Sequence, residues 1–128
     1  MIYVDSSVAL AHLLVESRSP PASLWNEPLV SSQLLEYEVW NRIHAYGLGR
    51  SHANEAQAFL FRVALIEMTA AVLARALEPF PTPVRTLDAL HLSTIEYVSN
   101  RRQTVELASY DNRLCAAAQA LGITIAAL

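Results

Sequence analysis

Residues 1–14, MIYVDSSVALAHLL, show the alternation of strand and helix that continues along the chain. Ile2, Tyr3 and Val4 form a short apolar run typical of a strand, and this run stops at Asp5. The serines that follow lead into VALAHLL, whose apolar residues have helical spacing. The stretch therefore predicts a strand over residues 2–4 and a helix over residues 8–14.

The same alternation is expected further along the sequence. Apolar spacing and turn residues predict strands over residues 29–32, 65–68, 104–110 and 123–127. They predict helices over residues 33–46, 51–64, 70–78, 86–98 and 112–121, with Thr69 as a cap and Gly122 closing the last helix. Alternating strands and helices favour an α/β fold, in which helices cover both faces of a mostly parallel sheet. We expect one domain over residues 1–128.

The composition indicates a protein partner. Apolar residues make up 53% of the chain and charged residues 16%, so we expect an oligomer or a bound protein to cover apolar surface. No run is apolar and long enough to span a bilayer, and Asp5 comes too early for a secretory signal. We therefore expect a cytoplasmic protein. Cys115 is the only cysteine, which excludes an internal disulfide and a cysteine zinc cluster.

The charged residues exclude several kinds of chemistry. A net charge of −3 argues against a passive binder of polyanions. The chain has no lysine, which excludes a phosphate-binding P-loop and a lysine Schiff base. Three glycines cannot form a glycine-rich dinucleotide loop, and the four histidines have no metal-binding spacing. Carboxylate chemistry remains.

The chain has only three aspartates, and each has a structural explanation of its own. Asp5 and Asp111 follow predicted strands and can cap the next helices, while Asp88 can complement the dipole of its helix. Together they favour a shared site, because the carboxyl ends of parallel strands lie along one edge where ligands bind. Converging carboxylates need a counter-charge, and oxygen ligands favour Mg²⁺ or Mn²⁺.

Glu38 is the fourth candidate acid. It borders the apolar face of its predicted helix, whereas Glu36 points elsewhere because it lies about 200° around the helix axis. An alternative role for Glu38 is an i, i+4 pair with Arg42, worth a few tenths of a kcal/mol. The two roles can coexist.

Four stretches spread over nearly the whole chain carry a family resemblance. They are MIYVDSS (1–7), SSQLLEYEVWNRI (31–43), RTLDALHLSTI (85–95) and ELASYDNRLCAAAQALGI (106–123). In this order they resemble the PIN domain, and most closely the VapC type, the ribonuclease of bacterial toxin–antitoxin systems. The resemblance implies a three-layer α/β/α fold and a catalytic quartet of Asp5, Glu38, Asp88 and Asp111. Asp5 and Asp88 would hold the principal Mg²⁺ or Mn²⁺ ion.

The resemblance also implies an activity and partners. It predicts a metal-dependent endoribonuclease toxin that leaves a 5′-phosphate and a 3′-hydroxyl, forms a homodimer and is bound by a VapB-like antitoxin. Ser6 and Ser109 stand where PIN domains usually have threonine, and both keep the hydroxyl. A housekeeping PIN nuclease in RNA processing and a catalytically inactive PIN-fold binding module are the alternatives.

Other residues near these motifs are candidates for supporting roles. Arg42, Arg85 and Arg113 are candidates for contacts to RNA phosphates, with surface solvation as the alternative. His91 is expected to be a packed core histidine rather than a general base, and Cys115 a buried small apolar residue. We expect four aromatic residues to serve the core or an antitoxin groove rather than to bind bases: Trp25, Tyr37, Trp40 and Tyr46.

Overall fold

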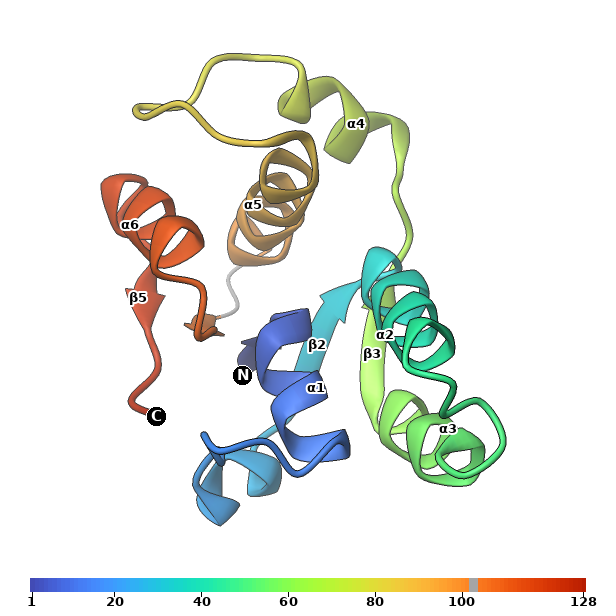
Figure 1. Cartoon of the computed structure of the whole chain (residues 1–128). Helices are drawn as coiled ribbons and strands as arrows, with labels where there is room; N and C mark the ends of the chain where they lie inside the picture. The colour runs from blue at the N-terminus through green and yellow to red at the C-terminus, as the bar shows by residue number, and fades with distance from the viewer. Residues whose placement is uncertain (102–103) are drawn as a thin grey trace.

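The computed structural model describes residues 1–101 and 104–128 and contains a five-stranded sheet packed between helices (Figure 1). The strands are β1 (Ile2–Val4), β2 (Leu29–Ser32), β3 (Val63–Ile66), β4 (Glu106–Ala108) and β5 (Thr124–Ile125). The helices are α1 (Ser6–Leu13), the 3₁₀ helix η1 (Ala22–Asn26), α2 (Leu34–Ala45), α3 (Ala53–Phe61), α4 (Ala70–Ala76), α5 (Thr86–Ser99) and α6 (Asn112–Ala120). Within the described residues, no helix has the length and apolar character needed to cross a membrane.

The order of the strands places β1 at the centre of the sheet. The order is β3-β2-β1-β4-β5, and every described pair is parallel, as the sequence predicted. Tyr3 of β1 pairs with Val30 on one side and with Leu107 on the other. The chain leaves β1 toward β2, whereas β4 lies on the opposite side of β1 and leads outward to β5. This reversal creates a switch point at the carboxyl ends of β1 and β4, where open α/β sheets bind ligands.

The alternating side chains of β1 separate the two halves of the core. Ile2 and Val4 belong to the apolar cluster that α1, α2 and α3 contribute to. Tyr3, between them, belongs to the second cluster, which contains apolar residues of α5 and α6. Helix α4 packs against α5, and Figure 1 shows α2 and α3 together on one side of the molecule and α6 on the other. The expected three-layer α/β/α fold is confirmed.

The boundary between α3 and β3 differs from the prediction. Helical spacing predicted a helix through residue 64 and a strand from residue 65, but α3 ends at Phe61 and β3 begins at Val63. The apolar run around this point fits either pattern, so spacing alone could not place the change. Pairing decides it, because Val63 pairs with Leu29 and continues the sheet. Strands β4 and β5 are also shorter than predicted.

Candidate active site

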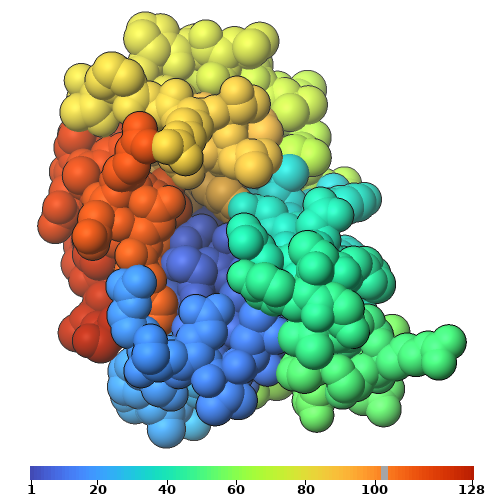
Figure 2. Space-filling view, viewed as in Figure 1, coloured from blue at the N-terminus to red at the C-terminus, as the bar shows by residue number. Residues whose placement is uncertain are grey.

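A cavity of about 480 Å³ opens at the switch point of the sheet. Figure 2 shows the blue start of α1 in a recess bordered by the gold start of α5, by α2 and by the orange segment around α6. The cavity wall includes eight of the site residues expected from the sequence: Asp5, Ser6, Glu38, Arg42, Arg85, Asp88, Asp111 and Arg113. Ser109, the ninth, lies behind this wall and binds Asp5. The tertiary structure therefore brings together residues that are more than 100 positions apart.

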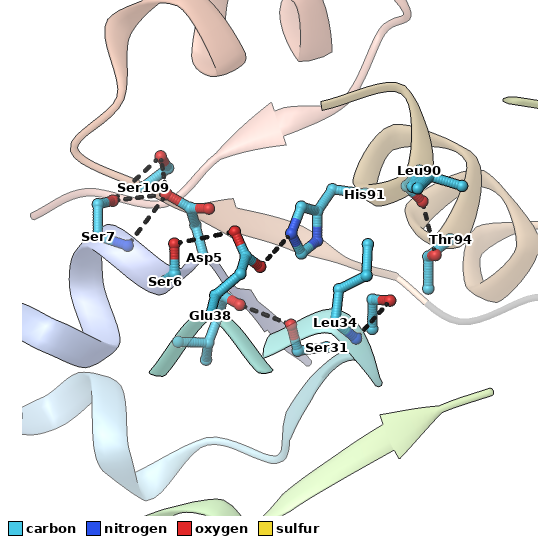
Figure 3. Close-up of polar contacts among 12 residues, drawn as sticks. Asp5, Ser6, Ser7, Ser31, Leu34, Glu38, Leu90, His91, Thr94 and Ser109 are labelled. Carbon is cyan, nitrogen blue, oxygen red and sulfur yellow. Dashed lines mark hydrogen bonds and ion pairs between the residues drawn. The ribbon is translucent and has the colours of Figure 1, made fainter. Parts of the chain in front are cut away.

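Asp5 is buried at the end of β1, and one of its carboxylate oxygens is held by three donors. Oδ2 accepts hydrogen bonds from Ser7 Oγ at 2.6 Å, from Ser109 Oγ at 2.8 Å and from the Ser7 backbone N–H at 3.3 Å (Figure 3). The bond to Ser7 N–H caps α1, as the sequence predicted. None of the hydrogen bonds found within residues 1–101 and 104–128 uses Oδ1. The donors thus fix the carboxylate and leave one oxygen for the cavity.

Asp111 also caps a helix. Its Oδ1 accepts from the backbone N–H groups of Arg113 at 2.9 Å and Leu114 at 3.2 Å, at the start of α6. Its own backbone N–H donates to Ser109 Oγ at 2.9 Å, which ties Asp111 to the serine that holds Asp5. The capping prediction for Asp111 is confirmed. Because capping uses one carboxylate oxygen, the side chain can also present the other to the cavity.

Asp88 lies in the first turn of α5, and its surroundings disfavour the charged form. Partial burial raises the pKa of its carboxyl, and the nearby carboxylates of Asp111 and Asp5 raise it further. His91 and Arg85 lower this pKa but do not offset the increase. Such a shift is typical of acids that share a site. The structure therefore places three aspartates in one electrostatic environment, where a cation would stabilise all of them.

Glu38 extends from α2 toward the same cavity and pairs with a residue that the sequence did not indicate. Its Oε1 lies 2.6 Å from His91 Nε2, and Ser6 Oγ donates to its Oε2 over 3.4 Å (Figure 3). Within the described part of the chain, no ion pair joins Glu38 to Arg42. Arg42 instead lies over the ring of Tyr46, with the guanidinium carbon 5.9 Å from the ring centroid. The i, i+4 alternative for Glu38 is therefore not formed.

His91 is packed in the core, as predicted, with 1% of its surface exposed. Its Nδ1 lies 2.7 Å from the hydroxyl of Tyr3, which is fully buried. Burial alone would lower the pKa of the His91 imidazole, but the hydrogen bond and charge of Glu38, together with Asp5 and Asp88, raise it overall. Burial raises the pKa of the Tyr3 phenol, so the hydroxyl keeps its proton. Sequence reasoning missed this connection because helical spacing reveals only neighbours on the same helix.

The donor set of the cavity fits a hard divalent cation. Within residues 1–101 and 104–128, no three side chains of His, Cys, Asp or Glu are already close enough together to bind one ion. Mg²⁺ does not require such a closed group, because it keeps several of its waters and uses one or two carboxylates. Asp5 Oδ1 and the carboxylate of Asp88 are available for that role, and carboxylates without sulfur ligands match Mg²⁺ or Mn²⁺.

The remaining candidates lie around this site or away from it. Trp25 packs against His12 and Phe59, and Trp40 is partly buried against the core, consistent with the predicted core roles. Tyr37 and Tyr46 are each 58% exposed, so neither belongs to the core. Cys115 is half-buried rather than fully buried, and its thiol donates to the Ser109 carbonyl at 3.6 Å.

Comparisons with known proteins show similarity over nearly the whole chain. The PIN domain family matches residues 2–124. Ribonuclease VapC46 of Mycobacterium tuberculosis (strain ATCC 25618 / H37Rv) is 30% identical to this chain over 129 residues, which cover 98% of this chain and 96% of that protein. Ribonuclease VapC35 of the same strain is 29% identical over 133 residues, covering 99% of this chain and 96% of that protein. The matched range, residues 2–124, includes every residue that lines the cavity.

Proposed function

The chain belongs to the PIN domain family, and on this premise we propose that it is a metal-dependent endoribonuclease that hydrolyses RNA phosphodiester bonds. The names of its relatives, ribonucleases VapC35 and VapC46, support an RNA substrate. The observation that carries the proposal is the convergence of four acids on one cavity: Asp5, Glu38, Asp88 and Asp111. These acids come from four separate elements, and helix capping explains only Asp5 and Asp111.

Arginines supply the charge that an acidic cavity needs in order to receive RNA. Arg42, Arg85 and Arg113 line the same wall as the acids, and a guanidinium can bind phosphate oxygens in pairs. Arg85 directly precedes α5, and the first backbone N–H groups of α5 add partial positive charge at the same place. We assign the phosphate contacts to these three residues.

The acids then divide the chemistry between them. Asp5 and Asp88 would hold one Mg²⁺ or Mn²⁺ ion, which would lower the pKa of a bound water and neutralise phosphate charge. Glu38 and Asp111 accept hydrogen bonds from the attacking water and orient it toward phosphorus. A bond forms between the water oxygen and phosphorus, and the phosphorus–O3′ bond breaks. The proton lost by the water is balanced by one taken up at O3′, which leaves a 5′-phosphate and a 3′-hydroxyl.

We further propose that this single domain of residues 1–128 is the toxin of a VapBC-type system, acts in the cytoplasm and forms a homodimer. The relatives' names support the toxin assignment. Exposed apolar side chains support a protein partner, because Phe61 is 92% and Leu77 is 89% exposed.

Light scattering of the purified chain, alone and after co-expression with the product of a small neighbouring gene, tests for the homodimer and for the antitoxin complex. If expression of the chain arrests growth and the neighbouring gene's product relieves that arrest, the chain is a toxin. If expression does not arrest growth, a housekeeping nuclease is favoured.

Substitution of the acids tests the reaction. We expect Asp5→Ala and Asp88→Asn to abolish Mg²⁺- or Mn²⁺-dependent cleavage of RNA, measured by gel, while circular dichroism shows a folded chain. Glu38→Gln and Glu36→Gln form a matched pair on α2, because Glu38 lines the cavity and Glu36 is exposed outside it. Only Glu38→Gln should slow cleavage. Cleavage at the parental rate by the Asp5 and Asp88 variants contradicts the proposed site and favours an inactive binding module.

A further inference from the structure

A continuous chain of hydrogen bonds connects the centre of the sheet to Glu38. The backbone N–H of Ser32 donates to Tyr3 OH at 3.1 Å, Tyr3 OH lies 2.7 Å from His91 Nδ1, and His91 Nε2 lies 2.6 Å from Glu38 Oε1. Tyr3 and His91 are 0% and 1% exposed, so both side chains are shielded from bulk solvent. No step of the reaction proposed above uses either residue.

The carboxylate at one end of this hydrogen-bonded chain fixes the position of one proton. A carboxylate oxygen of Glu38 can only accept, so the proton between the two residues belongs to His91 Nε2. Nδ1 accepts from the hydroxyl of Tyr3 when the imidazole is neutral and donates to that oxygen when the imidazole is protonated, so Nε2–H points at Glu38 in both states. The Tyr3 oxygen in turn accepts from Ser32 N–H. Each donor strengthens the next in a buried chain of this kind, which ends on the carboxylate.

This series of hydrogen bonds also connects elements on opposite faces of the sheet. Tyr3 belongs to β1 and His91 to α5, on the face that α5 and α6 cover. Glu38 belongs to α2, whose buried residues pack on the other face. Figure 3 shows His91 and Glu38 pointing at one another between these elements. The only other hydrogen bond found for the Glu38 carboxylate within the described residues is the longer one from Ser6, so His91 is its main support.

We propose that His91, oriented by Tyr3, is a positioning residue that holds the carboxylate of Glu38 in the cavity through Nε2–H. This inference rests on the proposed ribonuclease function and adds two residues to its site. It assigns His91 no contact with RNA and no proton transfer to it. Loss of such an indirect support typically slows an enzyme about 10- to 100-fold.

Two substitutions at position 91 separate positioning from packing. The amide nitrogen of Gln can take the position of Nε2 and reach Glu38. The side chain of Asn is one methylene shorter, so its amide nitrogen lies near the position of Nδ1 and cannot reach Glu38. We expect His91→Asn to lower kcat for RNA cleavage by about tenfold or more, with KM within about twofold of the parent. His91→Gln should recover most of that loss, and Tyr3→Phe should lower kcat by a smaller factor.

Ser93→Ala is the matched structural control. Ser93 lies on the same helix and is equally buried, and its hydroxyl donates to the Val72 carbonyl, away from the cavity. This substitution should lower Tm and leave kcat unchanged. If His91→Asn resembles Ser93→Ala in both measurements, His91 only supports the fold and the proposal is overturned.

A double-mutant cycle tests whether His91 acts through Glu38. If it does, His91→Asn should slow single-turnover cleavage in the parent but cause little further loss in a Glu38→Gln background. Equal losses in both backgrounds overturn the proposal, because the two side chains would then act independently.

Nitrogen NMR of the histidine side chains gives an answer that does not depend on cleavage. We expect Nε2 of His91 to carry a proton in the parent protein, with a resonance that shifts in Glu38→Gln. An unprotonated Nε2 overturns the positioning role. If the parent cleaves no RNA but shows this proton and this shift, the proposed function fails while the hydrogen-bonded chain stands.

Discussion

At the scale of single residues, the three aspartates differ in how much their own helices explain. Asp5 and Asp111 each use one carboxylate oxygen as a helix cap. The carboxyl group of Asp88 takes part in none of the side-chain hydrogen bonds found within the described ranges, and its burial, together with the carboxylates of Asp111 and Asp5, raises its pKa. Its position is therefore unfavourable for folding unless a cation is present, and such a position is common in functional sites.

Replacing Asp88 by asparagine should stabilise the metal-free protein. A raised pKa means that the folded state binds the proton more tightly than the unfolded state, so ionised Asp88 lowers the free energy of unfolding at neutral pH. This penalty disappears as the pH falls through the raised pKa. With EDTA at neutral pH, we expect Asp88→Asn to have a Tm a few degrees above the parent, and the difference should shrink in acid.

The control for this measurement is an exposed acid. Glu36→Gln changes the net charge by the same amount outside the cavity, and it should leave Tm nearly unchanged. A lower Tm for Asp88→Asn at neutral pH contradicts the electrostatic account of Asp88.

At the scale of elements, the end of each strand and the start of the next helix form one unit. Strand β4 leads through Ser109 to Asp111, which caps α6, and Ser109 also binds Asp5 after β1. The two strand ends are thereby connected by side chains as well as by the sheet. Capping and site formation consequently depend on the same short segments.

Two substitutions at Asp111 separate its cap from its place in the cavity. Asp111→Ala should destabilise the fold by about 1 kcal/mol because α6 loses its cap, whereas Asp111→Ser should keep most of the stability. Both remove the carboxylate, so both should cleave RNA far more slowly than the parent. Urea unfolding and cleavage rates check these outcomes. Parental cleavage by Asp111→Ser shows that the carboxylate has no role beyond capping.

At the scale of the whole molecule, an acidic protein must attract RNA through local charge. The net charge is −3, but three of the nine arginines line the cavity. Arg85 and Arg101 lie just beyond opposite ends of α5, so exchanging either for glutamine changes the total charge equally. The position of the charge, rather than its sum, should then decide how well RNA binds.

Arg85→Gln should therefore weaken RNA binding several-fold, roughly three- to tenfold at low salt, whereas Arg101→Gln should change it little. Fluorescence anisotropy of a labelled single-stranded RNA measures both dissociation constants. The difference should decrease at high salt because ions screen the contact. Equal effects of the two substitutions mean that Arg85 contributes only to the overall charge.

The elements could be predicted from local pattern, but their boundaries and the site's internal contacts could not. Residues 2–4 and 29–32 were predicted as strands with the bounds that the structure has. The start of β3 was wrong by two residues because pairing of Val63 with Leu29 overrides helical spacing. For Glu38 the near neighbour Arg42 was considered, but the actual partner is His91, 53 residues away. Spacing on one helix carries no information about such a partner.

The sequence by itself determined the alternation of strands and helices, the capping aspartates at two strand ends, and the absence of lysine chemistry. Each follows from local steric and hydrogen-bonding preferences or from composition. Family resemblance already grouped Asp88 and Glu38 in one site, but only the tertiary structure decided that β1 and β4 are neighbours and that hydrogen bonds join Tyr3 to His91 and His91 to Glu38. These features depend on how separate elements pack, and packing joins residues whose separation along the chain leaves no periodic signal.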